Sequence, residues 1–114
     1  MNDDRPVYLR LRDRIAAMIL EGRVGDGDPL PSVRSLAADF GANPLTVAKA
    51  YQTFQEEGLV TVKRGVGLFV APGAAERLRT AERREFLDKR WPRIVAHMRR
   101  LGLDPADLAE RALA

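Results

Sequence analysis

The chain has no cysteine and a single histidine, His97. Disulfides, cysteine nucleophiles and thiolate zinc sites are therefore excluded, and one imidazole without companion ligands gives little basis for a metal site. No apolar run approaches the length of a membrane span, and the N-terminal residues show no signal-peptide pattern. We find no nucleophile–base pair and no paired carboxylates. We therefore expect a cytoplasmic protein that is not an enzyme and uses no metal and no cofactor.

An excess of positive charge is also missing from most of the chain, although the net charge is +3. Of the 19 Lys and Arg residues, ten lie at or after residue 73, as do seven of the 16 Asp and Glu residues. Residues 1–72 therefore carry nine charges of each sign. Because the positive and negative charges of this part cancel, any recognition of a polyanion by it must depend on where the cations lie.

Residues 7–41 contain two stretches with helical periodicity. In the first, residues 7–21, apolar side chains recur at helical spacing, and a glycine-rich turn follows. The second begins after Ser32, which is suited to cap a helix from Val33, and it ends at Gly41. Its apolar residues follow the i, i+3, i+4, i+7 pattern of a short helix that buries one face.

A third helix is predicted from Pro44 to about Glu57, because Asn43 followed by Pro44 is a typical cap and first-turn pair. Its inward face is expected to consist of apolar residues at helical spacing, namely Val47, Ala50, Tyr51 and Phe54. The same spacing predicts an outward face made of Leu45, Thr46, Lys49 and Thr53, with Gln52 beside them.

After Gly58 the pattern changes to short β-branched or apolar stretches, residues 59–63 and 68–70. Two glycines in the connection 64–67 suit the tip of a β-hairpin. The order helix, turn, helix, hairpin predicts a winged helix-turn-helix, whose third helix enters the DNA major groove. We expect a mainly α fold with a small β wing: a DNA-binding domain over residues 1–72 and a helical dimerisation tail over residues 73–114.

Several side chains in residues 1–72 have the chemistry for contact with double-stranded DNA. Arg34 is expected in the first turn of the second helix, where backbone N–H groups and the helix dipole favour phosphate. Thr46 and Lys49 lie one turn apart near the start of the third helix. The hairpin adds cations beside glycines that allow close approach to the minor groove. The full set of predicted DNA contacts is Ser32, Arg34, Asn43, Leu45, Thr46, Lys49, Lys63, Arg64 and Gly65.

Residues 6–71 resemble the DNA-binding domain of the GntR family of bacterial transcription regulators. The most specific pieces are Leu30–Pro31–Ser32 with Arg34 and Leu36–Ala37, then Thr46–Val47, Ala50–Tyr51, Glu57–Gly58–Leu59, and Gly65 and Gly67 with Phe69–Val70. The resemblance implies a winged helix in which Arg34, Thr46 and Gly65 contact operator DNA.

The chain departs from the common family pattern at two places in the third helix. Many members have Ser–Arg where this sequence has Asn43–Pro44, and an arginine where it has Ala48. Two arginines that contact DNA in such members are thus absent here, and Lys49 can replace only one of them. The Asn–Pro pair and the short tail resemble the YtrA-like branch of the family.

Larger members carry an effector-binding or aminotransferase-like domain after the wing, and we expect neither in the residues that follow Gly73. This tail carries a heptad-type seam, with residues spaced 4, 3, 4 and 3 apart, made of Leu87, Trp91, Ile94, Met98 and Leu101. The seam must pack against the chain's own winged helix or a second copy, and a two-fold dimer matches the symmetry of operator half-sites. Pro92 lies inside this segment and predicts a kink or two shorter helices.

These features predict a homodimeric, sequence-specific transcriptional repressor that binds a palindromic operator. A small-molecule effector is left open as a further partner. The alternative is a winged helix that binds RNA or another protein, because residues 1–72 carry no net charge. An absence of salt-dependent binding to duplex DNA would favour that alternative.

Overall fold

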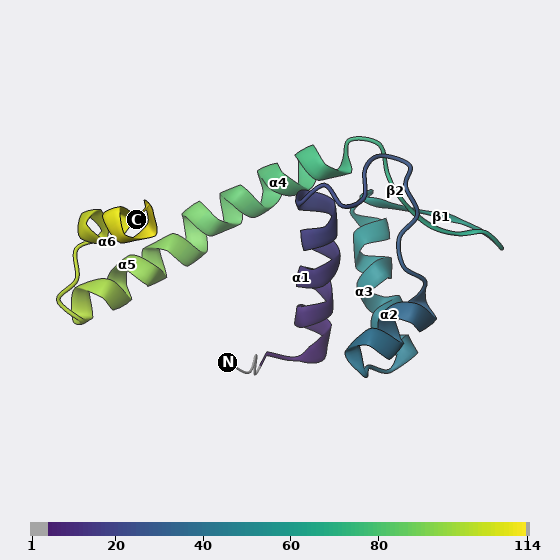
Figure 1. Ribbon diagram of the computed structural model, residues 1–114, viewed down its shortest axis with the longest axis horizontal. Helices are drawn as coiled ribbons and strands as arrows, with labels where there is room; N and C mark the ends of the chain where they lie inside the picture. The colour runs from purple at the N-terminus through teal and green to yellow at the C-terminus, as the bar shows by residue number, and fades with distance from the viewer. Residues whose placement is uncertain (1–4, 114) are drawn as a thin grey trace. The chain divides into compact units, whose positions relative to one another are not determined.

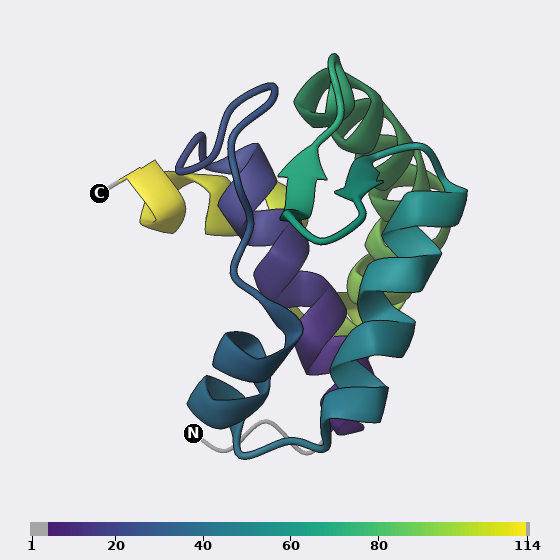
Figure 2. The ribbon, with the colours of Figure 1, turned by 90° about the vertical axis from the view of Figure 1, so that its right-hand side faces the viewer.

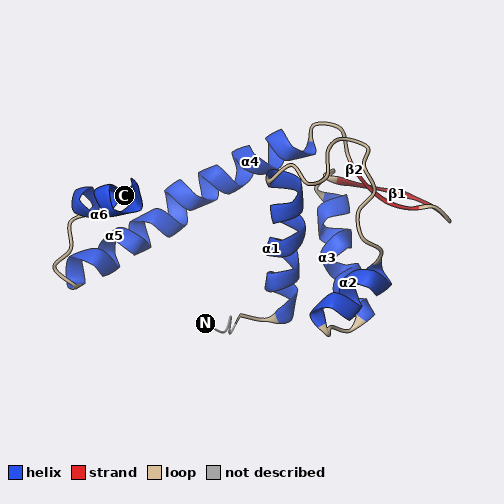
Figure 3. Ribbon diagram, in the orientation of Figure 1, coloured by secondary structure: helices blue, strands red, loops and turns tan. Residues whose placement is uncertain are grey.

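The computed structural model describes residues 5–113 of the chain, which divides into two compact units, residues 1–79 and residues 80–114. The described part of the first unit contains the complete helices α1, α2 and α3 and a two-stranded sheet, together with the first turns of α4 (Ala74–Glu85) (Figures 1 and 3). The helices are α1 (Val7–Leu20), α2 (Val33–Phe40) and α3 (Pro44–Glu56), and the strands are β1 (Val60–Lys63) and β2 (Gly67–Val70). The predicted mainly helical fold with a small β wing is confirmed.

Side-chain caps fix where α2 and α3 begin. The Ser32 hydroxyl accepts a hydrogen bond from the Ser35 N–H at 3.1 Å, and the Asn43 Oδ1 accepts from the Leu45 N–H at 2.8 Å. Each bond satisfies a backbone donor that the first turn of a helix leaves without a partner. The turn between the two helices passes through Gly41 at φ +59°, a left-handed conformation that glycine adopts without strain.

Helix α3 packs against α1, α2 and β1, so that the core of the first unit lies among these elements. Helices α1 and α3 run side by side in both views of the ribbon (Figures 1 and 2). The largest fully buried side chains of the core are Phe54, Leu11, Ile15, Ile19, Leu36, Val47 and Val70. The predicted inward face of the third helix is therefore confirmed, since all four of its residues are buried.

The wing is an antiparallel ribbon in which Val60 pairs with Val70 and Lys63 with Gly67. The segment before α2 joins the ribbon, because the Leu30 N–H donates to the Leu68 carbonyl at 2.8 Å and the Val70 N–H to the Asp28 carbonyl at 3.0 Å. These bonds satisfy backbone groups along β2 and anchor the wing to the helical part of the unit.

The remaining helices are α4 (Ala74–Glu85), a π-helical turn η1 (Phe86–Arg90), α5 (Trp91–Arg100) and α6 (Pro105–Leu113). The first turns of α4 belong to the first unit, because Ala74 and Leu78 are buried in its core. The division of the chain after residue 72 stays a prediction. Among residues 5–113, no helix is both long and apolar enough to cross a membrane.

Pro92 is accommodated by the π-helical turn that precedes it. The Trp91 N–H donates to the Phe86 carbonyl five residues earlier, and the backbone keeps helical angles at Arg90 and Trp91. A proline ring inside an α-helix clashes with the carbonyl four residues before it, which here is that of Asp88 in η1. The wider π turn therefore offers a physical reason why the helical backbone continues through Pro92 without a break.

Candidate DNA interface

The beginning of α2 presents an exposed arginine with no partner in the described part of the chain. Arg34 lies in the first turn, which contains no acidic residue. Backbone N–H groups and the helix dipole make this end of a helix favourable for phosphate, and a guanidinium adds two parallel donors. Ser32 differs, because its hydroxyl oxygen is engaged as the cap of α2. Arg34 is thus available for an anion, and Ser32 positions the helix that carries it.

The beginning of α3 exposes an apolar side chain. Leu45 is 78% exposed, whereas Thr46 is half-buried. The cap bond from Asn43 to the Leu45 backbone holds this end of the helix in one conformation. Asn43 thus contributes its oxygen to the helix, and Leu45 projects into solvent.

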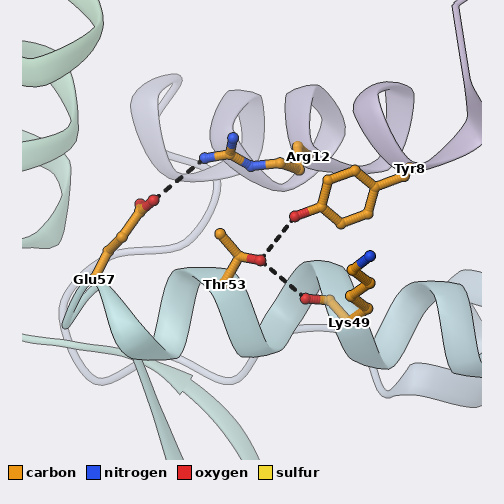
Figure 4. Close-up of polar contacts among 5 residues, drawn as sticks. All are labelled: Tyr8, Arg12, Lys49, Thr53 and Glu57. Carbon is orange, nitrogen blue, oxygen red and sulfur yellow. Dashed lines mark hydrogen bonds and ion pairs between the residues drawn. The ribbon is translucent and has the colours of Figure 1, made fainter.

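The side of α3 that faces α1 carries two polar residues, Lys49, which is exposed as predicted, and Thr53 (Figure 4). The Lys49 ammonium lies 5.4 Å from the centre of the Tyr8 ring, and the Tyr8 hydroxyl lies 2.7 Å from the Thr53 hydroxyl. The Thr53 hydroxyl donates to the Lys49 carbonyl at 3.1 Å, so the Tyr8 hydroxyl must be the donor to Thr53. The prediction that Thr53 projects outward was wrong, because it contacts α1.

One turn further along, the same two helices are linked by Arg12. Its guanidinium lies 3.5 Å from a carboxylate oxygen of Glu57 and 5.3 Å from the centre of the Phe54 ring. Tyr8 and Arg12 are four residues apart, and so are their partners Thr53 and Glu57, which is the spacing at which side chains of a helix share a face. This matched spacing is the sequence pattern that could have predicted Tyr8 as the partner of Thr53.

A buried tyrosine connects α3 to the segment before α2. The Tyr51 hydroxyl donates to the Pro31 carbonyl at 2.6 Å. Burial raises the pKa of the Tyr51 phenol well above its ordinary value, since the charged form is disfavoured away from water. Tyr51 therefore stays protonated and keeps the residues around Ser32 at a fixed distance from α3.

The tip of the wing carries exposed side chains and a glycine in the left-handed backbone conformation. The Val66 N–H donates to the Lys63 carbonyl at 2.9 Å and closes a turn in which Gly65 has φ +75°. Arg64 and Val66 are exposed at this tip, with Val66 at 73%. The Lys63 ammonium lies 4.6 Å from the centre of the Phe69 ring, which holds its stem along the ribbon.

The start of α2 and the wing together line a groove of about 570 Å³. It brings together four of the predicted contact residues, namely Ser32, Lys63, Arg64 and Gly65. Arg34 and the residues of α3 do not line it. The structure thus brings four of the predicted contacts together beside the wing, while Arg34, Asn43, Leu45, Thr46 and Lys49 lie outside this groove.

The predicted seam of the tail is largely exposed in the single chain. Leu87 is 50% exposed, Ile94 40% and Leu101 62%, while Trp91 lies near the Phe86 ring and is 38% exposed. Met98, in contrast, is buried. Four of the five seam residues therefore offer apolar surface.

Two capped helices at a tight turn, followed by a β wing with exposed cations, define this unit as a winged helix-turn-helix of the DNA-binding class. The model of the family described as bacterial regulatory proteins, gntR family, matches residues 7–70. The chain therefore belongs to the GntR family.

Two relatives from Bacillus subtilis extend this assignment. The HTH-type transcriptional regulator YhcF is 32% identical over 108 residues, which cover 93% of this chain and 86% of YhcF. The HTH-type transcriptional repressor YtrA is 39% identical over 69 residues, which cover 60% of this chain and 53% of YtrA. The chain is thus a YtrA-like transcriptional regulator and not an enzyme, as the sequence predicted.

A similar domain has been solved in complex with its operator. The DNA-binding domain of AraR in complex with the operator ORR3 has a TM-score of 0.58 and 27% sequence identity to this chain. The match covers 62% of this chain and 86% of the AraR domain.

Proposed function

We propose that the protein is a homodimeric repressor that binds a palindromic operator in the cytoplasm, with α3 in the major groove and the wing beside it. The observation that carries this proposal is the pair of exposed arginines, Arg34 and Arg64, which have no partner in the described part of the chain. Arginines of this kind neutralise phosphates and can pair with guanine. The similarity to a domain that is bound to operator DNA supports the same role.

The dimer is proposed from the exposed seam of the tail. Leu87, Ile94 and Leu101 recur at heptad spacing, and apolar stripes of this kind pack against another helix. A two-fold dimer presents two copies of the winged helix, and so two half-sites separated by about one helical turn of DNA or a multiple of it. Repression is proposed because the relative YtrA is named a repressor.

Selection from a pool of random duplexes tests the proposal. We expect the full chain to enrich an inverted repeat, and sedimentation of the selected duplex should show two chains per site. Enrichment of sites without two-fold symmetry would contradict the dimer model. Failure to enrich any duplex, together with binding to RNA or to a protein partner, would favour the alternative function.

A further inference from the structure

We infer that α3 recognises A·T pairs in the operator through thymine methyl groups, an inference that rests on the proposed function. Three exposed residues of α3, spaced three and four apart, form one stripe: Leu45, Ala48 and Gln52. We call these residues the α3 stripe. Two of its members are apolar, and none is charged.

The contacts of α3 with α1 leave the stripe as its open side. Lys49 and Thr53, the polar residues next to the stripe, are engaged with Tyr8. The opposite side of the helix is buried in the core through Val47 and Ala50. Gln55 and Glu56 are exposed as well, but they lie at the C-terminal end of α3, whereas the N-terminal residues of a recognition helix contact the base edges. A helix that enters the major groove with its open side therefore presents a leucine, an alanine and an amide to the base edges.

The chemistry of the stripe matches the major-groove edge of an A·T pair. The C5 methyl of thymine is the one apolar group on that edge of the bases, and apolar side chains contact it. A glutamine amide can pair with N6 and N7 of adenine. Guanine is recognised mainly by arginine or lysine, and the stripe has neither. Leu45 is held for such a contact, because the Asn43 cap fixes the backbone that carries it.

Removal of single methyl groups from the selected operator tests this inference. Each thymine of a half-site is replaced in turn by deoxyuridine, which lacks only the C5 methyl, and the Kd of the full chain is measured. One lost methyl contact should weaken binding about fourfold. We expect at least one position with this effect for the native chain and no effect at that position for Leu45→Ala.

The matched control is Val66→Ala, which truncates an exposed apolar side chain on the wing. It should retain the full deoxyuridine effect of the native chain. Thermal unfolding of both variants should match the native chain, since each truncated side chain is exposed. Tight binding that no deoxyuridine substitution weakens would overturn this inference alone, and so would an undiminished effect in Leu45→Ala. Failure to bind any duplex would overturn the proposed function as well.

Discussion

The ammonium of Lys49 on α3 lies 5.4 Å from the centre of the Tyr8 ring on α1. A cation over an aromatic face is attracted to it, by about 0.5–1 kcal/mol at exposed sites. The contact turns Lys49 toward the neighbouring helix, although the sequence suggests it as a DNA contact. DNA contact by Lys49 stays a prediction. We expect Lys49 to contribute less to the binding free energy than Arg34, which has no such partner in the described residues. Lys49→Met should therefore weaken operator binding less than Arg34→Ala, as measured by titrated mobility shift. An equal or larger loss of affinity for Lys49→Met would show that Lys49 is a main DNA contact.

The hydrogen bond between Tyr8 and Thr53 should stabilise the packing of α1 on α3. Tyr8→Phe keeps the ring under Lys49 and removes only the hydroxyl, so we expect a loss of about 0.5–1.5 kcal/mol in the free energy of unfolding. Thr53→Val is the matched partner variant, because it keeps the shape of the side chain. Denaturant unfolding of the double variant should show that Tyr8→Phe costs little once Thr53 is valine. Additive losses would mean that the two hydroxyls do not interact.

Tyr51 makes the stability of the fold sensitive to alkaline pH. Its pKa is raised in the folded state, so the folded protein holds this proton more tightly than the unfolded chain does. The stabilisation is therefore complete below the unfolded pKa of about 10 and is lost as the pH rises through the folded pKa. Tyr51→Phe should cost about 1–2 kcal/mol at neutral pH, because the Pro31 carbonyl loses its donor. It should also lose less stability than the native chain above pH 10, and identical pH profiles would contradict this account.

The conformation of the wing tip requires glycine at position 65 because of its backbone angle, and not because a side chain would lack space there. A Cβ at this position meets no atom within 4 Å, but φ +75° is strained for residues with a side chain. Gly65→Val should therefore distort the turn at a cost of about 1–2 kcal/mol and weaken operator binding. Gly65→Asn is the control, since asparagine tolerates this conformation better. Equal binding by the two variants would show that the turn conformation does not matter for DNA contact.

The seam of the tail should hold the dimer together. Ile94→Asp places a charge on the exposed apolar stripe, and we expect monomers in light scattering with a loss of operator affinity. Ala96→Asp adds the same charge to an exposed position of α5 outside the seam and should leave the dimer intact. Retention of the dimer in Ile94→Asp would place the interface elsewhere.

The sequence predicted the parts of the fold that local chemistry determines. Caps at Ser32 and Asn43, the stop at Gly41 and the glycine-tipped hairpin depend on a few adjacent residues, and the structure confirms each of them. Periodicity also identified the buried side of α3. It could not show which of the remaining sides faces α1, because that depends on how two helices pack. Thr53 was misplaced for this reason.

The π-helical turn before Pro92 lay beyond local prediction as well. A proline inside a helical pattern is compatible with a kink, a break or a widened turn, and the sequence does not distinguish these. Which of the three forms depends on the hydrogen bond that the Trp91 N–H makes, and the structure shows that this bond goes to the Phe86 carbonyl.

The most direct test of the central claim is a salt titration of operator affinity for the native chain and Arg34→Ala. We expect log Kd to rise steeply with log salt for the native chain, since phosphate contacts release counterions. Arg34→Ala should bind about 1–3 kcal/mol more weakly, with a shallower slope if Arg34 contacts a phosphate. Arg23→Ala, which removes an exposed arginine paired with Glu21, is the control and should match the native chain. Binding of operator by Arg34→Ala with native affinity and native salt dependence would contradict the account.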